Sequence, residues 1–181
     1  DLLARWDGHM RVDSAAATLY WVWRAKLKDG GARPDEGVIL QRRALPREQQ
    51  QALLRALAAA KDEIVERHGR LAVPWGDVHR IRRGDRSWPA AGGDYTLRAI
   101  GSSEEGGVYY GKSGQSWTQV VLFRKGAVES YSATPYGQSD HADSPHYTDQ
   151  AEKLFSQCRL KPTWFRREAL EGHVKSATRL R

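Results

Sequence analysis

The sequence predicts an α+β fold in which helices come first, antiparallel strands follow, and further helices close the chain. Apolar residues recur at helical spacing before residue 70. Short β-branched and aromatic runs separated by glycine follow up to about residue 135, and a polar turn then leads into helical stretches. Helices followed by strands, without regular alternation, are typical of this class. We therefore expect 1–181 to be a single segment, helical over 1–70, strand-rich over 71–135, with a turn and C-terminal helices over 136–181.

The composition indicates a folded, basic protein. Hydrophobic residues make up 40% of the chain, seven residues are Trp, and the formal net charge is +7. Such a charge allows binding to a phosphate backbone, but the Lys and Arg residues are scattered and form no stripe along one helix. We favour a solvated basic surface and predict no nucleic-acid partner. A stand-alone basic binding module for nucleic acid or an acidic surface is the alternative.

Cysteine content and hydropathy exclude further classes of protein. The single cysteine, Cys158, rules out an internal disulfide and multi-cysteine metal motifs. No apolar run reaches the roughly 18 residues that a membrane-spanning helix needs, so we predict no membrane span. The first residues, Asp1 to Gly8, have neither the basic start nor the apolar block of a signal peptide. We expect the chain to be a fragment or a processed product.

Two helices are predicted in the first part of the chain. Ser14 is a suitable N-cap for a helix from Ala15 to about Leu27, which is apolar on nearly all sides and must therefore be buried on nearly all sides. The tryptophans at 21 and 23 are expected to pack in a core rather than line a pocket. After a polar linker at 30–35, Pro46 begins a second helix that ends at His68 before Gly69. Its predicted apolar face consists of Leu53, Leu54, Leu57, Ala60, Ile64 and Val65.

The middle of the chain is predicted to form strands between loops. An irregular basic segment follows Pro74, and 88–93 is expected to be a loop. The predicted strands are Tyr95 to Ile100, Thr118 to Phe123 and Val128 to Thr134, the last two joined by a turn at Arg124-Lys125-Gly126.

The segment from Gly106 to Ser113 matches the phosphate-binding pattern G-x-x-x-x-G-K-[ST]. A working phosphate loop follows a buried strand and opens a helix. Here two glutamates precede the segment and a β-rich run follows it. We therefore interpret it as a flexible glycine-rich loop between strands and predict no nucleotide cofactor.

The densest group of polar side chains lies at 136–150, after a predicted strand and before a predicted helix at 151–157. We favour a structural turn in which Asp140, Asp143, Ser144 and Thr148 satisfy backbone donors. Two other interpretations stay open. Ser144, His146 and Asp149 could form a hydrolase triad, although triad members normally meet through tertiary structure. A zinc site would use His141, Asp143, His146 and Asp149, whose spacing matches no common zinc motif. A last helix is predicted from Phe165 to about Val174.

Several of these motifs together resemble the penicillin acylase family, in the branch that contains acyl-homoserine lactone acylases and aculeacin-type acylases. Their order and spacing match the C-terminal part of the β subunit over nearly the whole chain. The residues that carry the resemblance are Trp6-Asp7-Gly8, Pro74-Trp75-Gly76-Asp77-Val78-His79-Arg80, Gly92-Gly93, Gly114 with Ser116, Gly137-Gln138-Ser139, Ser144-Pro145-His146-Tyr147 and Asp149-Gln150.

The resemblance implies an N-terminal-nucleophile hydrolase that cleaves itself into two chains and is periplasmic or secreted. The implied fold is a four-layer αββα sandwich. A serine at the new N-terminus of the β chain would attack an N-acyl amide, with its own amine as the base, which suits an amine whose pKa lies near 8. The implied partners are the α chain and the N-terminal part of the β chain, with no cofactor.

The resemblance carries no catalytic residue onto this chain. It begins at Asp1, which is not a nucleophile of this type, and it contains no asparagine to complete an oxyanion hole. We therefore expect this segment to supply scaffold, and possible pocket wall, and to be inactive alone. The matched positions, with no metal ligand among them, are expected to be structural: Trp75, Gly76, His79, Gly137, Gln138, Ser139, Ser144, His146, Asp149 and Gln150.

Overall fold

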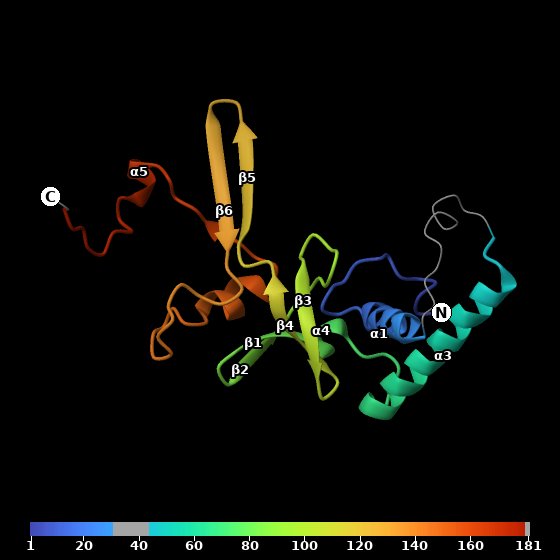
Figure 1. The fold of residues 1–181 in the computed structure, drawn as a ribbon. Helices are drawn as coiled ribbons and strands as arrows, with labels where there is room; N and C mark the ends of the chain where they lie inside the picture. Colours follow the sequence, from blue (N-terminus) through green and yellow to red (C-terminus); the bar gives the residue numbers. More distant parts are fainter. Residues whose placement is uncertain (31–43, 180–181) are drawn as a thin grey trace. The chain divides into compact units, whose positions relative to one another are not determined.

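The computed structural model describes residues 1–30 and 44–179. The chain folds as two compact units, Asp1–Gly114 and Gln115–Arg181, and each is described here by itself. Most of the predicted linker at 30–35 lies outside the described residues. Figure 1 shows the helices and a small sheet of the first unit and the long β-hairpin of the second.

The first unit begins with the predicted buried helix. Helix α1 (Ala15–Asp29) starts at Ser14, whose Oγ accepts a hydrogen bond from the Ala17 backbone N–H at 3.2 Å. This bond satisfies one of the free donors at the helix start. The residues 16–19, together with Val22 and Leu27, are buried. The N-cap is confirmed, but burial on nearly all sides is not, because Ala25 is exposed and Trp21 and Trp23 are only half-buried.

The second long helix, α3 (Arg47–His68), also follows the prediction. It ends at Gly69, which adopts the left-handed conformation (φ 69°) that glycine tolerates best. The Trp23 Nε1–H donates to the Leu53 carbonyl oxygen at 3.0 Å and so ties α1 to α3. The predicted apolar face is wrong at two positions, because Leu54 and Val65 are 65% and 45% exposed. These two residues point away from the stripe that carries Ala60 and Ile64.

A single hydrophobic core joins these two helices to the segment 73–78, which leads into the sheet of the first unit. Its buried members are Ala17, Leu19, Val22, Ala60, Ile64, Val73, Trp75 and Val78. Half-buried aromatic residues, including Trp6, Trp21 and Trp23, pack around it. The tryptophans at 21 and 23 therefore pack against the core, as predicted.

A mixed four-stranded sheet follows, in the order β2-β1-β4-β3. The short helix α4 (Trp75–Val78) leads directly into it. The strands of the sheet are β1 (His79–Arg83), β2 (Arg86–Pro89), β3 (Ile100–Glu105) and β4 (Val108–Gly114). Strand β1 runs parallel to β4, and the other pairs are antiparallel.

Three sequence predictions fail in this region. The basic segment after Pro74 forms a regular β1–β2 hairpin, and the predicted loop at 88–93 begins inside β2. The predicted strand from Tyr95 to Ile100 is wrong, because residues 94–98 form a turn and a bend, Tyr95 itself has φ 61°, and the strand begins only at Ile100. The supposed flexible loop at 106–113 is the turn of a β3–β4 hairpin followed by β4. A strand follows the turn where a working phosphate loop would open a helix, so the segment lacks the structural context of a phosphate loop.

The second unit contains a small antiparallel sheet. Its strands are β5 (Thr118–Arg124), β6 (Ala127–Ala133) and β7 (Lys161–Pro162), in the order β5-β6-β7. The predicted hairpin between β5 and β6 is confirmed. Pro162 lies in the terminal strand β7, where a missing N–H is tolerated.

The predicted C-terminal helices are shorter than expected. Residues 151–155 form the π-helical turn η1 (Ala151–Phe155), in which the Ser156 N–H donates to the Ala151 carbonyl at 3.0 Å. The last predicted helix is reduced to α5 (Arg167–Leu170), whose residues are all exposed. Without an apolar face to bury, a longer helix there gains little stability. Among the helices of the described residues, none has the length and apolar character needed to cross a membrane.

Candidate functional site

The predicted signature residues of the second unit form a turn that closes on itself. Gly137 lies against the backbone at 146–147, and a Cβ added to Gly137 would collide with the His146 carbonyl. The Ser139 N–H donates to the same His146 carbonyl oxygen at 3.2 Å. Only glycine permits two backbone segments to approach this closely. The turn is therefore fixed by main-chain contacts.

Two further contacts anchor this turn to the sheet. The Ala151 N–H donates to the Tyr136 carbonyl oxygen at 2.6 Å, which brings the two ends of the turn together. Gln150 is buried, and its Oε1 accepts a hydrogen bond from the Thr134 N–H at 3.1 Å. Gln150 thus supplies an acceptor to the backbone just beyond β6. Gln138, by contrast, is exposed.

The candidate triad is only partly assembled. The His146 Nδ1 lies 3.0 Å from the Asp149 Oδ2, which is hydrogen-bonding distance. The Ser144 Oγ, however, accepts from the His146 backbone N–H at 3.2 Å and makes no hydrogen bond to the imidazole. Nucleophilic catalysis by serine requires the ring to take the hydroxyl proton. The geometry is that of a capped turn with an exposed imidazole.

The candidate zinc ligands are not gathered either. Within residues 1–30 and 44–179, no group of three or more His, Cys, Asp or Glu side chains lies close enough to hold a metal ion. The Asp149 Oδ1 is buried without a hydrogen-bond partner in the described structure, while its Oδ2 contacts His146. One histidine and one carboxylate make an ion pair or hydrogen bond, and do not make a tetrahedral site.

The predicted residues of the first unit form a second cluster around Trp75. The rings of Trp75 and His79 stack with their centroids 4.5 Å apart and an interplanar angle of 8°. The Trp75 Nε1–H donates to the Gly92 carbonyl oxygen at 2.8 Å. The Gly76 N–H donates to the Val12 carbonyl oxygen at 2.7 Å, and a Cβ on Gly76 would lie 2.9 Å from the Val12 Cβ. These contacts tie the start of the chain to α4 and to the segment after β2.

His79 is fully buried in this cluster. Its Nδ1 lies 2.7 Å from the Ala90 carbonyl oxygen, which can only accept, so Nδ1 carries the hydrogen. Its Nε2 is buried with no hydrogen-bond partner among the described residues. Desolvation lowers the pKa of His79 below its usual value, against the Ala90 hydrogen bond, which raises it. The imidazole is therefore held neutral as a structural group.

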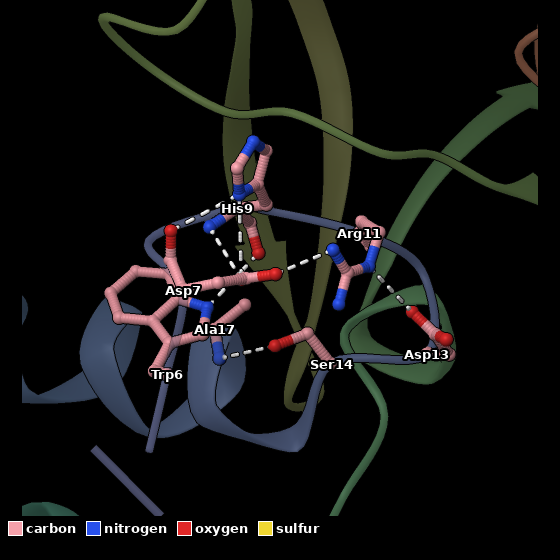
Figure 2. A network of polar contacts seen from close by, with 7 residues as sticks. All are labelled: Trp6, Asp7, His9, Arg11, Asp13, Ser14 and Ala17. Carbon is pink, nitrogen blue, oxygen red and sulfur yellow. Dashed lines mark hydrogen bonds and ion pairs between the residues drawn. The ribbon is translucent and has the colours of Figure 1, made fainter. Parts of the chain in front are cut away.

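A third polar network surrounds Trp6 and Asp7 (Figure 2). The Asp7 Oδ1 accepts from the His9 N–H at 3.0 Å, and the Asp7 Oδ2 lies 2.6 Å from the Arg11 Nη1. The hydrogen bond from His9, followed by the Arg11 contact, lowers the pKa of the Asp7 carboxyl. The Trp6 Nε1–H donates to the His9 carbonyl oxygen at 3.0 Å. This network holds the chain in a turn before α1.

An open cavity of about 380 Å³ lies beside this network. It is lined by Asp1, Leu2, Arg5, Trp6, Asp7, Arg11, Ser14, Ala15 and Ala16. The Asp7 carboxylate forms an ion pair with Arg11, so it is not free to act as a general acid or base. The residues that line the cavity therefore do not form a nucleophile–base pair.

The matched motifs thus lie at the positions that fix the fold of each unit. A family model described as penicillin amidase matches residues 1–172. The chain belongs to the penicillin amidase family. Members of this family are hydrolases, and the α+β fold described above is consistent with a domain of this family.

In this member of the penicillin amidase family, the motifs around Trp75 and Gly137 are rich in main-chain contacts. The sequence motifs included Trp75, Gly76 and His79. Their hydrogen-bond partners, the backbone carbonyls of Val12, Ala90 and Gly92, were not predicted, because every residue has a backbone carbonyl. The only signal in the sequence is the paired glycine at 92–93. A Cβ on Gly92 (φ 91°) would collide with the Arg98 carbonyl oxygen.

Proposed function

We propose that this chain is the C-terminal segment of the β chain of an N-acyl amide hydrolase. It supplies scaffold and a part of the pocket wall, while the nucleophile lies on another part of the enzyme. The family match over residues 1–172 supports the acylase class. The branch of acyl-homoserine lactone and aculeacin-type acylases is the finer assignment, carried by the motifs around Trp75 and Ser144.

One observation carries the scaffold role. In both signature clusters, polar groups that could perform chemistry are used to hold the backbone: Ser144 caps a turn, His79 donates to a carbonyl and Gln150 accepts from an N–H. A catalytic hydroxyl or imidazole must instead face a substrate. The sequence also contains no asparagine that could donate a side-chain amide to an oxyanion hole.

The proposal assigns partners and a compartment to the chain. Its partners are the α chain and the N-terminal part of the β chain, and its substrate is an N-acyl amide such as an acyl-homoserine lactone, a lipopeptide or a β-lactam. Like other enzymes of this type it would work in the periplasm or outside the cell. It needs no cofactor for this reaction, because an activated serine and water suffice for amide hydrolysis.

The experiment compares variants of the full-length precursor, assayed with a chromogenic N-acyl amide and an acyl-homoserine lactone. We expect Ser144→Ala and His146→Ala to lower the yield of folded, self-processed enzyme and to leave kcat of the surviving enzyme within about threefold of the unchanged protein. Ser176→Ala, in the exposed tail, is the matched control and should change neither quantity. A fully folded, processed enzyme that loses turnover in either of the first two variants would contradict the scaffold role.

A further inference from the structure

Thr18 is the one polar side chain among the buried residues of α1. A threonine inside a helix often donates its hydroxyl hydrogen to the carbonyl oxygen four residues earlier. Here that oxygen belongs to Ser14 and already accepts from the Trp75 N–H at 3.1 Å. The Thr18 Oγ1 is buried and has no hydrogen-bond partner among the described residues. Because a buried hydroxyl without a partner destabilises a fold, this group needs a partner from outside the helix.

A small cavity lies beside Thr18, between α1, α3 and the turn that joins β3 to β4. It gives the centre of a water-sized sphere about 10 Å³ of space. Roughly 10–15 Å³ of such space is enough for one water molecule, and cavities that stay empty in proteins are apolar. The lining of this cavity is partly polar, since it includes the side chains of Thr18, Glu63, Arg67, His68 and Tyr109.

Tyr109 lines the cavity from β4, and its ring packs against the core of the first unit. Burial, and then the nearby Glu63 carboxylate, raise the pKa of the Tyr109 hydroxyl to about 12. The hydroxyl therefore stays protonated, and it can both donate and accept a hydrogen bond. The two oxygens of Glu63 contact Lys26 and Arg67, one each, and each oxygen has a lone pair left for another donor.

The glycine-rich turn lies against the end of α3 at this cavity. The Gly107 N–H donates to the Glu104 carboxylate, whose Oε1 lies 2.9 Å from the Arg67 Nη1. A Cβ on Gly107 would lie only 3.5 Å from the Arg67 Cδ, so the turn packs directly on that side chain. The segment that matches the phosphate-binding pattern therefore lines a cavity with room for one water molecule, which is too small for a phosphate group.

We propose that this cavity is a binding site for one ordered water molecule, held by the Thr18 and Tyr109 hydroxyls and by the Glu63 carboxylate. A buried water typically makes about three hydrogen bonds to polar groups that otherwise lack partners. The water joins α1, β4 and α3 through one side chain from each. The site lies wholly within the first unit, so it does not depend on where the nucleophile of the enzyme lies.

A crystal structure of the full-length protein, at a resolution that shows ordered water, tests the site directly. We expect one water at about 2.5–3.0 Å from the Thr18 Oγ1 and at a similar distance from the Tyr109 hydroxyl or the Glu63 carboxylate. A cavity without ordered water would overturn the proposal. A Thr18 hydroxyl bonded directly to a protein group would overturn it as well.

Two conservative variants test the same site in solution. Thr18→Val replaces the hydroxyl by a methyl group of similar size, and Tyr109→Phe removes only the hydroxyl. Removing a buried hydroxyl that has no partner leaves stability unchanged or raises it. We expect instead that each variant lowers the urea midpoint of the first unit, because each loses a hydrogen bond to the water. The double variant should lose little more than the worse single variant, since both hydroxyls hold the same water.

Tyr110→Phe is the matched control for Tyr109→Phe. Tyr110 is the next residue of β4 and points to the opposite face, where the Arg82 guanidinium lies 4.2 Å from its ring centroid. Its effect should add to that of Thr18→Val. Thr18→Ser keeps the hydroxyl, so Tyr109→Phe should cost as much in that background as in the unchanged protein. A raised midpoint in Thr18→Val, or additive losses for Thr18→Val and Tyr109→Phe, would contradict the shared water.

Discussion

At the scale of single residues, His79 shows how a group suited to catalysis serves the fold. Its imidazole is stacked on Trp75, donates from Nδ1 to the Ala90 carbonyl and is fully buried. Burial lowers its pKa, so the native protein keeps it neutral at pH values where the unfolded chain binds a proton.

This difference predicts a dependence of stability on pH. An unfolded histidine has a pKa of about 6.5, so above that pH the neutral ring costs nothing. As the pH falls below about 6.5, the unfolded state binds more protons, and the free energy of unfolding decreases by up to about 1.4 kcal/mol per pH unit until the lowered folded pKa is reached. Urea denaturation between pH 7.5 and about 5, followed by tryptophan fluorescence, measures this slope.

Two variants isolate the contribution of His79. The His79→Gln variant should be less stable at neutral pH but should show a clearly weaker loss of stability on acidification. The His141→Gln variant, which removes an exposed imidazole, should keep the slope of the unchanged protein. An unaltered slope in His79→Gln would show that His79 is not the group whose protonation opposes folding.

Gly137 provides a second prediction at the residue scale. A methyl group at this position would collide with the His146 carbonyl, so one of two backbone segments must move. We expect Gly137→Ala to lower the free energy of unfolding of the second unit by about 1–3 kcal/mol more than the control Gly126→Ala does. In the control Gly126→Ala the added methyl meets no atom within 4 Å and costs only the left-handed backbone conformation at φ 76°, about 1–2 kcal/mol. Equal losses in the two variants would contradict the close approach at Gly137.

At the scale of elements, the N-cap of α1 is the most direct target. Ser14 accepts from the Ala17 N–H, and its carbonyl oxygen also accepts from the Trp75 N–H at 3.1 Å. The Ser14→Ala variant keeps the second contact and loses the first. We expect a loss of about 1 kcal/mol in the unfolding of the first unit, measured by urea denaturation. Ser176→Ala is the control, and a loss of the same size there would argue against the cap.

The sequence predicted those elements whose pattern is strong over many residues. Helices α1 and α3 combine a cap or stop signal with long helical periodicity, and β5 and β6 combine apolar runs with a turn at 124–126. Strand β1 was missed because four of its five residues are basic. The Arg80 side chain nevertheless donates hydrogen bonds to the Ser87 hydroxyl and to the Gly76 carbonyl. A local sequence pattern does not predict these contacts.

Strand β4 was missed for a related reason. Its Gly111 suggests a loop, but a Cβ there would lie 3.0 Å from the Ile100 Cγ2 and 3.4 Å from the Ile81 Cγ2. Glycine at 111 thus allows side chains from β3 and β1 to pack across β4. Tertiary packing of this kind overrides the local preference for a turn.

At the scale of the whole molecule, the candidate site was predictable in type but not in detail. The turn containing Ser144 and His146 is predicted to be structural; in the structure Gly137, Ser139 and Gln150 make main-chain contacts in and beside this turn. The backbone hydrogen-bond partners could not be predicted, because every residue has a carbonyl group and the sequence does not indicate which one accepts. The nucleophile is proposed to lie on the rest of the enzyme.

The location of the nucleophile is the central claim, and covalent labelling tests it most directly. The processed, active enzyme is treated with a sulfonyl fluoride, which reacts with activated hydroxyl groups, and the modified peptide is located by mass spectrometry. We predict that inactivation follows the modification of one residue outside residues 1–181 of this chain, with Ser139 and Ser144 unmodified. Inactivation that instead follows modification of Ser139 or Ser144 would place the nucleophile in this chain and contradict the account.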